Sequence, residues 1–108
     1  MGSPSLEAGD AVAAPDLAKI DVLTVLQALS DPVRLSIVRQ LAAGGDDGLM
    51  CHQLELSVTK STASHHLKTL YRAGITGERE QGVCKYVHLR RAELDRYFPG
   101  FLETVLKT

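Results

Sequence analysis

The stretch from Asp31 to Gly45 constrains the fold most, because its residues specify both ends of one helix. In "DPVRLSIVRQLAAGG", Asp31 is a residue type that caps the amino end of helices, and Pro32 suits the first helical position. Gly44 and Gly45 end the helix. Between these signals runs an apolar stripe at helical spacing: Val33, Ile37, Val38 and Leu41. The sequence therefore predicts a helix that packs one side against a core.

A second helix is predicted from about residue 60 to residue 73, with Thr59 as its cap and Gly74 after its end. Its apolar stripe is narrow: Ala63, Leu67 and Leu70. Before it, "LMCHQLEL" is expected to form a short helix and "SVT" a turn. Two short helices joined by a turn of a few residues predict a helix-turn-helix.

The pattern then changes to that of strands. In "ITGEREQGVCKYVHL", residue types typical of strands stand on either side of Glu80-Gln81-Gly82, which is expected to form a hairpin turn. "RRAELDRYFPGFLETVL" is helical again, interrupted at Pro99-Gly100. The predicted fold class is mainly α with a small β-hairpin.

The amino-terminal region divides into a tail and a helix. Residues 1–15 lack the charged start and apolar run of a secretion signal and are expected to be a flexible tail, with the folded domain over 16–108. A helix of about 13 residues follows, with apolar residues on much of its circumference. One face is expected to meet the core and the other a second copy of the chain. The two stripes are Leu17, Ile20, Leu23 and Leu26, and Val22, Val25 and Leu29.

Charge is distributed unevenly along the 108 residues, although the net charge is only -1. The first 31 residues hold five acids and one base, Lys19. From Ser57 to Arg91 there are seven bases and two acids. A polyanion is therefore expected at the second region. No segment approaches the roughly 18 apolar residues of a membrane span, so no membrane association is expected.

The polar side of the 60–73 helix is the main candidate for that polyanion. Short hydroxyls near a helix amino end can approach base edges or phosphates, and the free N–H groups there favour phosphate oxygens. A solvated helix face is the simpler interpretation, but the clustered positive charge and the basic hairpin that follows favour DNA. The residues on this side are Lys60, Ser61, Thr62, Ser64, His65, Lys68 and Arg72.

The adjacent histidines are interpreted separately. Neighbouring residues on a helix point about 100° apart, so His65 and His66 do not chelate one ion together. We interpret His65 as an outward hydrogen-bond donor to DNA. His66 borders the apolar stripe and is expected to be structural, hydrogen-bonded between helices.

Two stretches, "LQALSDPVRLSIVRQL" and "KSTASHHLKTLYRAGI", together with the following hairpin, resemble the ArsR/SmtB family of winged-helix transcriptional repressors. The resemblance runs from about Leu17 to Leu106. It implies a winged helix-turn-helix that forms a homodimer through its first and last helices. The apolar residues expected at that interface are Leu17, Ile20, Leu23, Phe98, Phe101, Leu102 and Val105.

The resemblance also implies how DNA is bound. The family's usual DNA-contacting positions correspond to Lys60, Ser61, Thr62, Ser64 and His65, in a recognition helix that enters the major groove. Lys68 and Arg72 would add phosphate contacts. The wing would lie against the neighbouring backbone through Arg79, Gln81 and Lys85, for which a solvated hairpin edge is the alternative.

The ligands of the family's metal sensors are not reproduced. Where one well-known site has a Cys-x-Cys pair, this chain has Cys51 and His52, and the last helix offers only Glu93, Asp95 and Glu103. Cys84 and His88, four residues apart on one strand, are about 13 Å apart, too far to share a zinc ion. No metal and no cofactor is therefore expected.

The two cysteines suit a reducing cytoplasm and form no disulfide framework. Cys51 is expected to be a small buried hydrophobic residue near the core. Cys84, on the hairpin, is expected to be exposed enough to oxidise, although no neighbouring base marks it as reactive.

These observations predict a cytoplasmic, dimeric, sequence-specific DNA-binding repressor that occludes a promoter. Its operator would be pseudo-palindromic, with half-sites about one helical turn apart. One alternative is a winged-helix module that binds another protein, and another is a metal- or redox-responsive repressor that uses Cys51 or Cys84. An enzyme is not expected, because the sequence has no Gly-rich phosphate loop, convincing nucleophile or paired-carboxylate motif.

Overall fold

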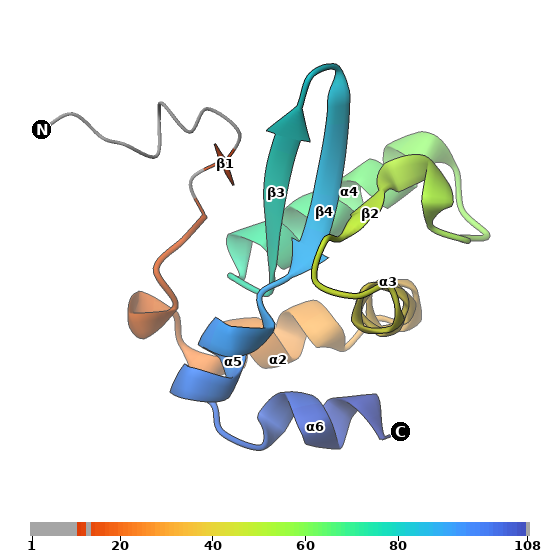
Figure 1. Ribbon diagram of the computed structural model, residues 1–108. Coiled ribbons are helices and arrows are strands. Elements are labelled where there is room, and N and C mark those ends of the chain that lie inside the picture. Colours follow the sequence, from red (N-terminus) through yellow and green to blue (C-terminus); the bar gives the residue numbers. More distant parts are fainter. Residues whose placement is uncertain (1–10, 13, 108) are drawn as a thin grey trace, which may run out of the picture.

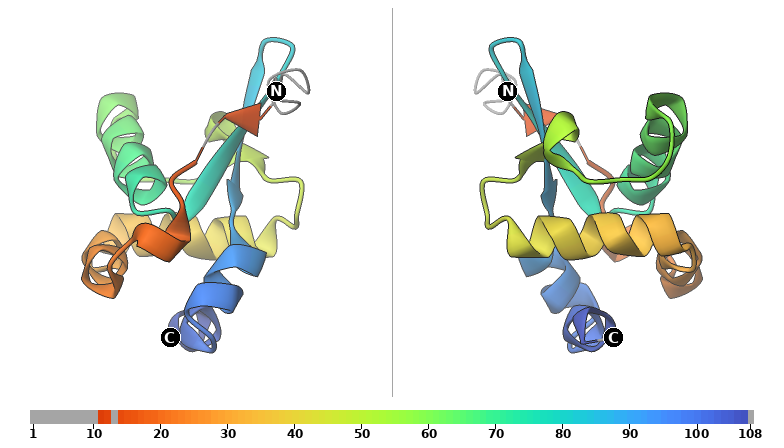
Figure 2. Two further views of the ribbon diagram at one scale, coloured as in Figure 1. Left: turned by 90° about the vertical axis from the view of Figure 1, so that its left-hand side faces the viewer. Right: turned by 90° about the vertical axis from the view of Figure 1, so that its right-hand side faces the viewer.

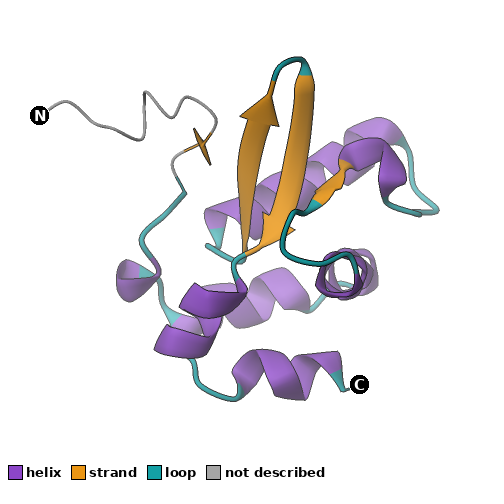
Figure 3. Ribbon diagram, viewed as in Figure 1, coloured by secondary structure: helices purple, strands orange, loops and turns teal. Residues whose placement is uncertain are grey.

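The computed structural model describes residues 11–12 and 14–107, in which helices lie against one face and one end of a small antiparallel sheet whose hairpin projects beyond them (Figures 1 and 3). The strands are β1 (Ala11–Val12), β2 (Leu49–Met50), β3 (Thr76–Gln81) and β4 (Cys84–Leu89), in the order β1-β3-β4-β2. The helices are α2 (Val22–Leu29), α3 (Pro32–Ala43), α4 (Lys60–Arg72), α5 (Arg91–Tyr97) and α6 (Phe101–Leu106). A hairpin that follows the helix-turn-helix region makes this a winged helix, as predicted.

Both ends of α3 lie where the sequence places them. The Asp31 carboxylate accepts a hydrogen bond of 3.1 Å from the backbone N–H of Val33, Pro32 is the first helical residue, and Gly44 is the C-cap. Three residues of its predicted stripe are buried: Ile37, Val38 and Leu41. The fourth, Val33, is partly buried and packs against the core.

The end of α4 is also confirmed and has a tertiary role. The N–H of Ile75 donates to the carbonyl of Leu70 at 3.1 Å, and Gly74 has a φ of +79°, which is the usual glycine termination of a helix. A Cβ at Gly74 would lie 2.6 Å from Cδ2 of Leu17 and 2.8 Å from Cδ1 of Ile20. Glycine therefore also lets the amino-terminal segment pack closely over this turn.

The first helix is shorter than predicted. Leu17–Lys19 form a single 3-10 turn, and α2 begins only at Val22. Asp21 separates the two, because its carboxylate caps α2 by accepting a 3.1 Å hydrogen bond from the N–H of Leu23. The helical spacing of apolar residues continues across this break. The spacing therefore predicted one continuous helix, although Asp21 starts a new one.

The segment between α3 and α4 is not the short helix predicted over "LMCHQLEL". Leu49 and Met50 form β2, which pairs with Val87 and Tyr86 of β4, and only Cys51–Gln53 form a 3-10 turn. Pairing with β4 extends the backbone of these residues, which outweighs their weak local preference for a helix.

The hairpin turn lies later than predicted. Gln81 pairs with Cys84, so the turn is Gly82-Val83 instead of Glu80-Gln81-Gly82. Gly82 has a φ of +63° and every described residue with positive φ is a glycine. Glycine at the first central position is typical of a type II′ hairpin turn.

Part of the predicted tail is described. Residues 1–10 and 13 lie outside the described residues, but Ala11 and Val12 form β1, paired with Arg79 and Glu78 of β3. The carbonyl of Pro15 accepts a 2.8 Å hydrogen bond from Arg90.

The core lies between the helices and the lower part of the sheet. Figure 2 shows α2 and α6 at one end of the molecule, whereas the amino end of α4 and the hairpin turn point toward the other. Fourteen apolar residues form the core: Leu17, Val25, Ala28, Ile37, Val38, Leu41, Leu54, Leu67, Leu70, Ala73, Ile75, Val87, Leu94 and Leu102.

Candidate nucleic-acid interface

The outer side of α4 is a continuous polar surface, which we call the α4 face. Leu67 and Leu70 are buried beneath it and Ala63 is half-buried, so the helix is anchored along its predicted stripe. The seven residues of the α4 face are all exposed: Lys60, Ser61, Thr62, Ser64, His65, Lys68 and Arg72. The face has three cationic side chains and no carboxylate.

The amino end of α4 is held by Thr59. Its hydroxyl oxygen accepts a 3.2 Å hydrogen bond from the N–H of Thr62 and donates to the Thr62 hydroxyl at 3.0 Å. In the part of the chain that the structure describes, the side chains of Ser61, Ser64 and His65 make no hydrogen bond; only the backbone carbonyl of His65 accepts one, from the Thr69 hydroxyl. Their polar atoms are therefore available to a partner, whereas one hydrogen bond of Thr62 is already made.

The wing differs from expectation at Arg79. Its guanidinium donates to the Gln81 side chain at 2.6 Å and to the carbonyl of Asp47 at 3.2 Å, and it lies 4.6 Å from the centre of the Tyr86 ring. Arg79 is half-buried, so it ties the loop after α3 to the hairpin. One hydrogen bond thus joins the side chains of Arg79 and Gln81, two of the three wing candidates, within the chain.

Lys85 remains the most accessible cation of the wing. Its ammonium group lies 3.3 Å from a carboxylate oxygen of Glu78, and its side chain is 51% exposed. The Glu78 side chain is only 18% exposed, but the Lys85 end of the pair is open to solvent, so a phosphate can compete for the ammonium group. Between Lys85 and α4 lies a groove of about 330 Å³, lined also by Ser64, Lys68 and Arg72.

His66 has the structural role predicted for it. Its Nδ1 lies 3.0 Å from a guanidinium nitrogen of Arg34 on α3, and its side chain is only 12% exposed. Sequence reasoning missed Arg34, which also contacts the end of α2. The sequence around Arg34 does not predict these contacts, because its partners lie on α2 and α4 and not on its own helix, α3.

The expectation that Cys51 is buried is wrong. Cys51 is exposed at the start of its 3-10 turn and lines the groove beside α4, because the turn places it outside the core. Cys84 is intermediate in exposure, and both thiols are free. Across the described ranges, no three His, Cys, Asp or Glu side chains come together as a metal site requires.

The apolar residues predicted at a dimer interface divide into two groups. Leu17 and Leu102 are only 2% and 1% exposed within the single chain. The prediction that they lie at a dimer interface is therefore wrong, and they belong to the core. Leu23 is 60% exposed, and Val22 and Leu26 beside it are 43% and 45% exposed. We call these three residues the α2 patch. Ile20, Phe98, Phe101 and Val105 are half-buried.

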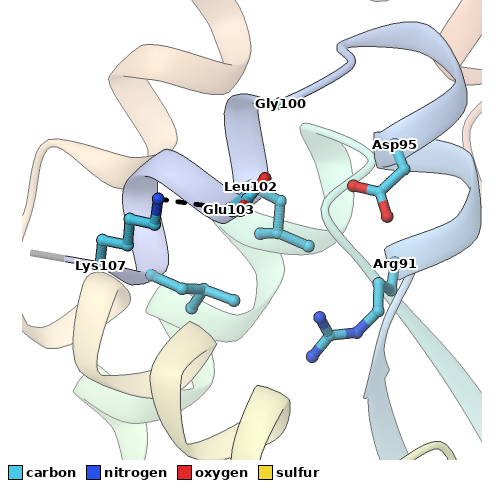
Figure 4. Close-up of a pocket in the computed structure, with 7 residues that line it drawn as sticks. Arg91, Asp95, Gly100, Leu102, Glu103 and Lys107 are labelled. Carbon is cyan, nitrogen blue, oxygen red and sulfur yellow. Dashed lines mark ion pairs between the residues drawn. The ribbon is translucent and has the colours of Figure 1, made fainter.

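A surface groove of about 500 Å³ lies between α5 and α6 (Figure 4). Arg91 and Asp95 approach it from α5, and Glu103 of α6 pairs at 3.8 Å with Lys107, the residue after α6. The two cations and two carboxylates around it balance, so the groove offers no charge preference to a ligand.

No helix of the described residues is long and apolar enough to cross a membrane.

Comparisons with known proteins agree with this geometry. A helix-turn-helix domain model matches residues 29–76, which span α3 to the start of β3. An uncharacterized HTH-type transcriptional regulator of Bacillus subtilis, YceK, is 43% identical over 83 residues, covering 75% of this chain and 82% of that protein. The chain belongs to the HTH-type transcriptional regulators.

Two further relatives support the same assignment. An uncharacterized HTH-type transcriptional regulator of Methanocaldococcus jannaschii is 34% identical over 65 residues, or 60% of this chain and 73% of that protein. A cadmium resistance transcriptional regulatory protein CadC homolog of Staphylococcus aureus is 36% identical over 77 residues, or 68% of this chain and 64% of that protein. This HTH-type regulator therefore carries a DNA-binding domain whose second helix is α4.

Proposed function

We propose that this regulator is a homodimeric, sequence-specific repressor of the ArsR/SmtB type that occludes a promoter in the cytoplasm. We place its one folded domain over residues 16–108, to whose sheet Ala11 and Val12 add the short strand β1. Its operator consists of two related half-sites. The observation that carries the proposal is the α4 face, with seven exposed polar residues on a helix anchored by Leu67 and Leu70.

Base recognition is assigned to the amino-terminal half of α4. The exposed side chains of Ser61, Ser64 and His65 have no hydrogen-bond partner in the described chain, so they can reach base edges without first losing a hydrogen bond. Lys60 and Thr62 flank them. A protein-docking helix would instead present exposed aromatic or aliphatic anchors, which the α4 face lacks.

Backbone binding is assigned to cations around that half. Lys68 and Arg72 continue the α4 face, and Lys85 lies across the 330 Å³ groove from them. Phosphate contacts release counterions, so affinity should fall steeply as the salt concentration rises. Arg79 and Gln81 of the wing are also proposed to contact the DNA backbone, with one hydrogen bond between them that orients both side chains.

A second copy of the chain is the partner proposed for the α2 patch. Val22, Leu23 and Leu26 are adjacent exposed apolar residues on one helix, and they lie at the end of the molecule away from the hairpin turn (Figure 2). Pairing two such patches across a two-fold axis would bury them and leave both α4 faces outward. This interface would extend to the partly exposed surfaces of Phe98, Phe101 and Val105.

The decisive experiment selects bound sequences from random duplex DNA and then measures affinity for the selected and a random duplex at fixed salt. Replacing Ser64 and His65 together with Ala should remove the preference for the selected duplex while the dimer stays folded. Lys85→Ala should weaken both duplexes by a similar factor, since phosphate contacts carry no sequence information.

Lys107→Ala is the charge-matched control for Lys85→Ala, because Lys107 is an exposed lysine directly after α6, and α6 lies at the end of the molecule away from the hairpin turn (Figure 1). It should leave both affinities unchanged. Full sequence preference in the Ser64/His65 double variant would contradict the assignment of base recognition to α4.

A further inference from the structure

Arg34, on α3, is bound to the end of α2. Its Nε donates to the carbonyl of Ala28 at 2.6 Å, and Nη2 lies 3.4 Å from the carbonyl of Gln27. Both carbonyls are in the last turn of α2. The Gln27 carbonyl already accepts hydrogen bonds from the N–H and the hydroxyl of Ser30, at 3.2 and 2.8 Å, so the Ala28 carbonyl is the main partner of the guanidinium. A cation at a helix carboxyl end is also favoured by the helix dipole. The guanidinium thus acts as a cap supplied by the next helix.

The remaining guanidinium nitrogen of Arg34 reaches α4. Nη1 lies 3.0 Å from Nδ1 of His66. A guanidinium can only donate hydrogen bonds, so Nδ1 is the acceptor in this contact. On its other side, Nε2 lies 4.0 Å from Oδ2 of Asp31, whose Oδ1 caps α3.

This arrangement places one planar group between three helices. Arg34 belongs to α3, its carbonyl partners to α2 and its imidazole partner to α4. His66 directly follows His65 of the α4 face, and Gln27 directly follows Leu26 of the α2 patch. The guanidinium therefore joins the backbone beside the proposed dimer interface to a side chain beside the proposed base-reading residues. The His66 and Asp31 side chains are 12% and 22% exposed, so competition from water is limited.

We propose that Arg34 and His66 are positioning residues that set the angle of α4 relative to α2, and thereby the half-site spacing that the dimer accepts. This rests on the proposed function, in which α2 lies at the two-fold axis and α4 reads DNA. Neither residue needs to touch DNA for this role. Lysine cannot replace Arg34. The planar guanidinium has a fork of N–H donors that bind the α2 carbonyl and the His66 ring at the same time, and a single ammonium group lacks this fork.

The test compares three variants of the full chain on duplexes whose half-sites are moved apart or together by one or two base pairs. Arg34→Lys keeps the charge but loses the fork, and His66→Phe keeps a ring but loses the acceptor. His66→Asn restores an acceptor oxygen near the position of Nδ1. Circular dichroism and light scattering establish that each variant is a folded dimer, and a duplex with one half-site measures the binding of α4 alone.

Wild type should prefer one spacing. Arg34→Lys and His66→Phe should bind that spacing about tenfold or more weakly, in line with the loss of a hydrogen bond to a charged group, and should accept altered spacings almost equally well. Their affinity for a single half-site should change little, and His66→Asn should recover the wild-type preference. The control Arg96→Lys, at an exposed arginine on α5, should leave the preference intact.

The outcomes separate the two proposals. If both Arg34→Lys and His66→Phe keep the wild-type spacing preference, the positioning role is overturned and the repressor proposal stands. If His66→Asn behaves like His66→Phe, the hydrogen bond is not what positions α4, which also overturns the inference. If wild type binds every spacing equally, the proposed reading of paired half-sites fails first, and the inference falls with it.

Discussion

The side-chain amide of Gln40 pairs with the backbone of Glu55 through two hydrogen bonds. Nε2 of Gln40 donates to the carbonyl of Glu55 at 2.9 Å, and Oε1 accepts from the N–H of Glu55 at 2.8 Å. This pairing attaches the loop before α4 to α3. It therefore fixes the turn of the helix-turn-helix with groups from two elements that are far apart in the sequence.

Replacing Gln40 with Leu should lower the free energy of unfolding by about 1 to 3 kcal/mol, because both backbone groups of Glu55 lose their partner. Gln40→Glu is the matched control for direction: a carboxylate still accepts from the N–H but repels the carbonyl. It should also destabilise the protein at neutral pH. Urea denaturation measures both, and wild-type stability in Gln40→Leu would contradict the importance of the pairing.

Gly48 and Gly45 should respond differently to alanine although both have positive φ, +84° and +88°. A Cβ at Gly48 would lie 2.4 Å from the carbonyl oxygen of Val87, whereas nothing lies within 4 Å of a Cβ at Gly45. Gly45→Ala should cost roughly 1 to 2 kcal/mol of backbone strain. Gly48→Ala should cost clearly more, because β2 must move away from β4. Equal midpoints in urea would show that the sheet yields without cost.

Leu23→Asp should convert the proposed dimer into a folded monomer, since Leu23 is 60% exposed and its loss leaves the core intact. A carboxylate buried at an interface between two copies has no partner and is strongly unfavourable. Light scattering gives the mass, and circular dichroism the helical content. Val83→Asp is the control, because Val83 is fully exposed in the hairpin turn. An unchanged dimer in Leu23→Asp would place the interface elsewhere.

Stability should fall as the pH drops below about 6.5, partly through His88. Burial lowers the pKa of His88 from 6.5; Glu93 opposes this shift, while Arg90 and Arg79 add to it. The unfolded chain therefore binds a proton at a higher pH than the folded chain, so acidification favours unfolding from about the unfolded pKa downward.

His88→Gln tests this by removing the titrating group. The stability difference between pH 8 and pH 5 should be smaller in the variant than in wild type, as measured by urea denaturation at both values. The variant also loses the packing of the His88 ring against Gly77, where a Cβ would lie 2.6 Å from the ring. That loss appears at both pH values and cancels in the difference. An identical pH dependence would contradict the shifted titration.

Much of the candidate interface could be predicted from the sequence, because its determinants are local. The caps at Asp31 and Thr59 act on N–H groups two and three residues away, and glycine alone tolerates the backbone that ends α4 at Gly74. Helical periodicity then places Leu67 and Leu70 on one side and Ser64, His65 and Lys68 on the other. These relationships need only the geometry of a single helix.

The tertiary structure decided which of the similar side chains do what, since those roles depend on partners distant in the sequence. Leu17 and Leu23 fit one apolar stripe, yet the close approach to Gly74 buries the first and leaves the second exposed. Arg79 and Lys85 are both wing cations, yet only Arg79 reaches the carbonyl of Asp47. Pairing with β4 extends Leu49 and Met50 and leaves Cys51 outside the core. Local pattern determines which way a residue points on its own element, whereas only the packing of elements determines what it meets there.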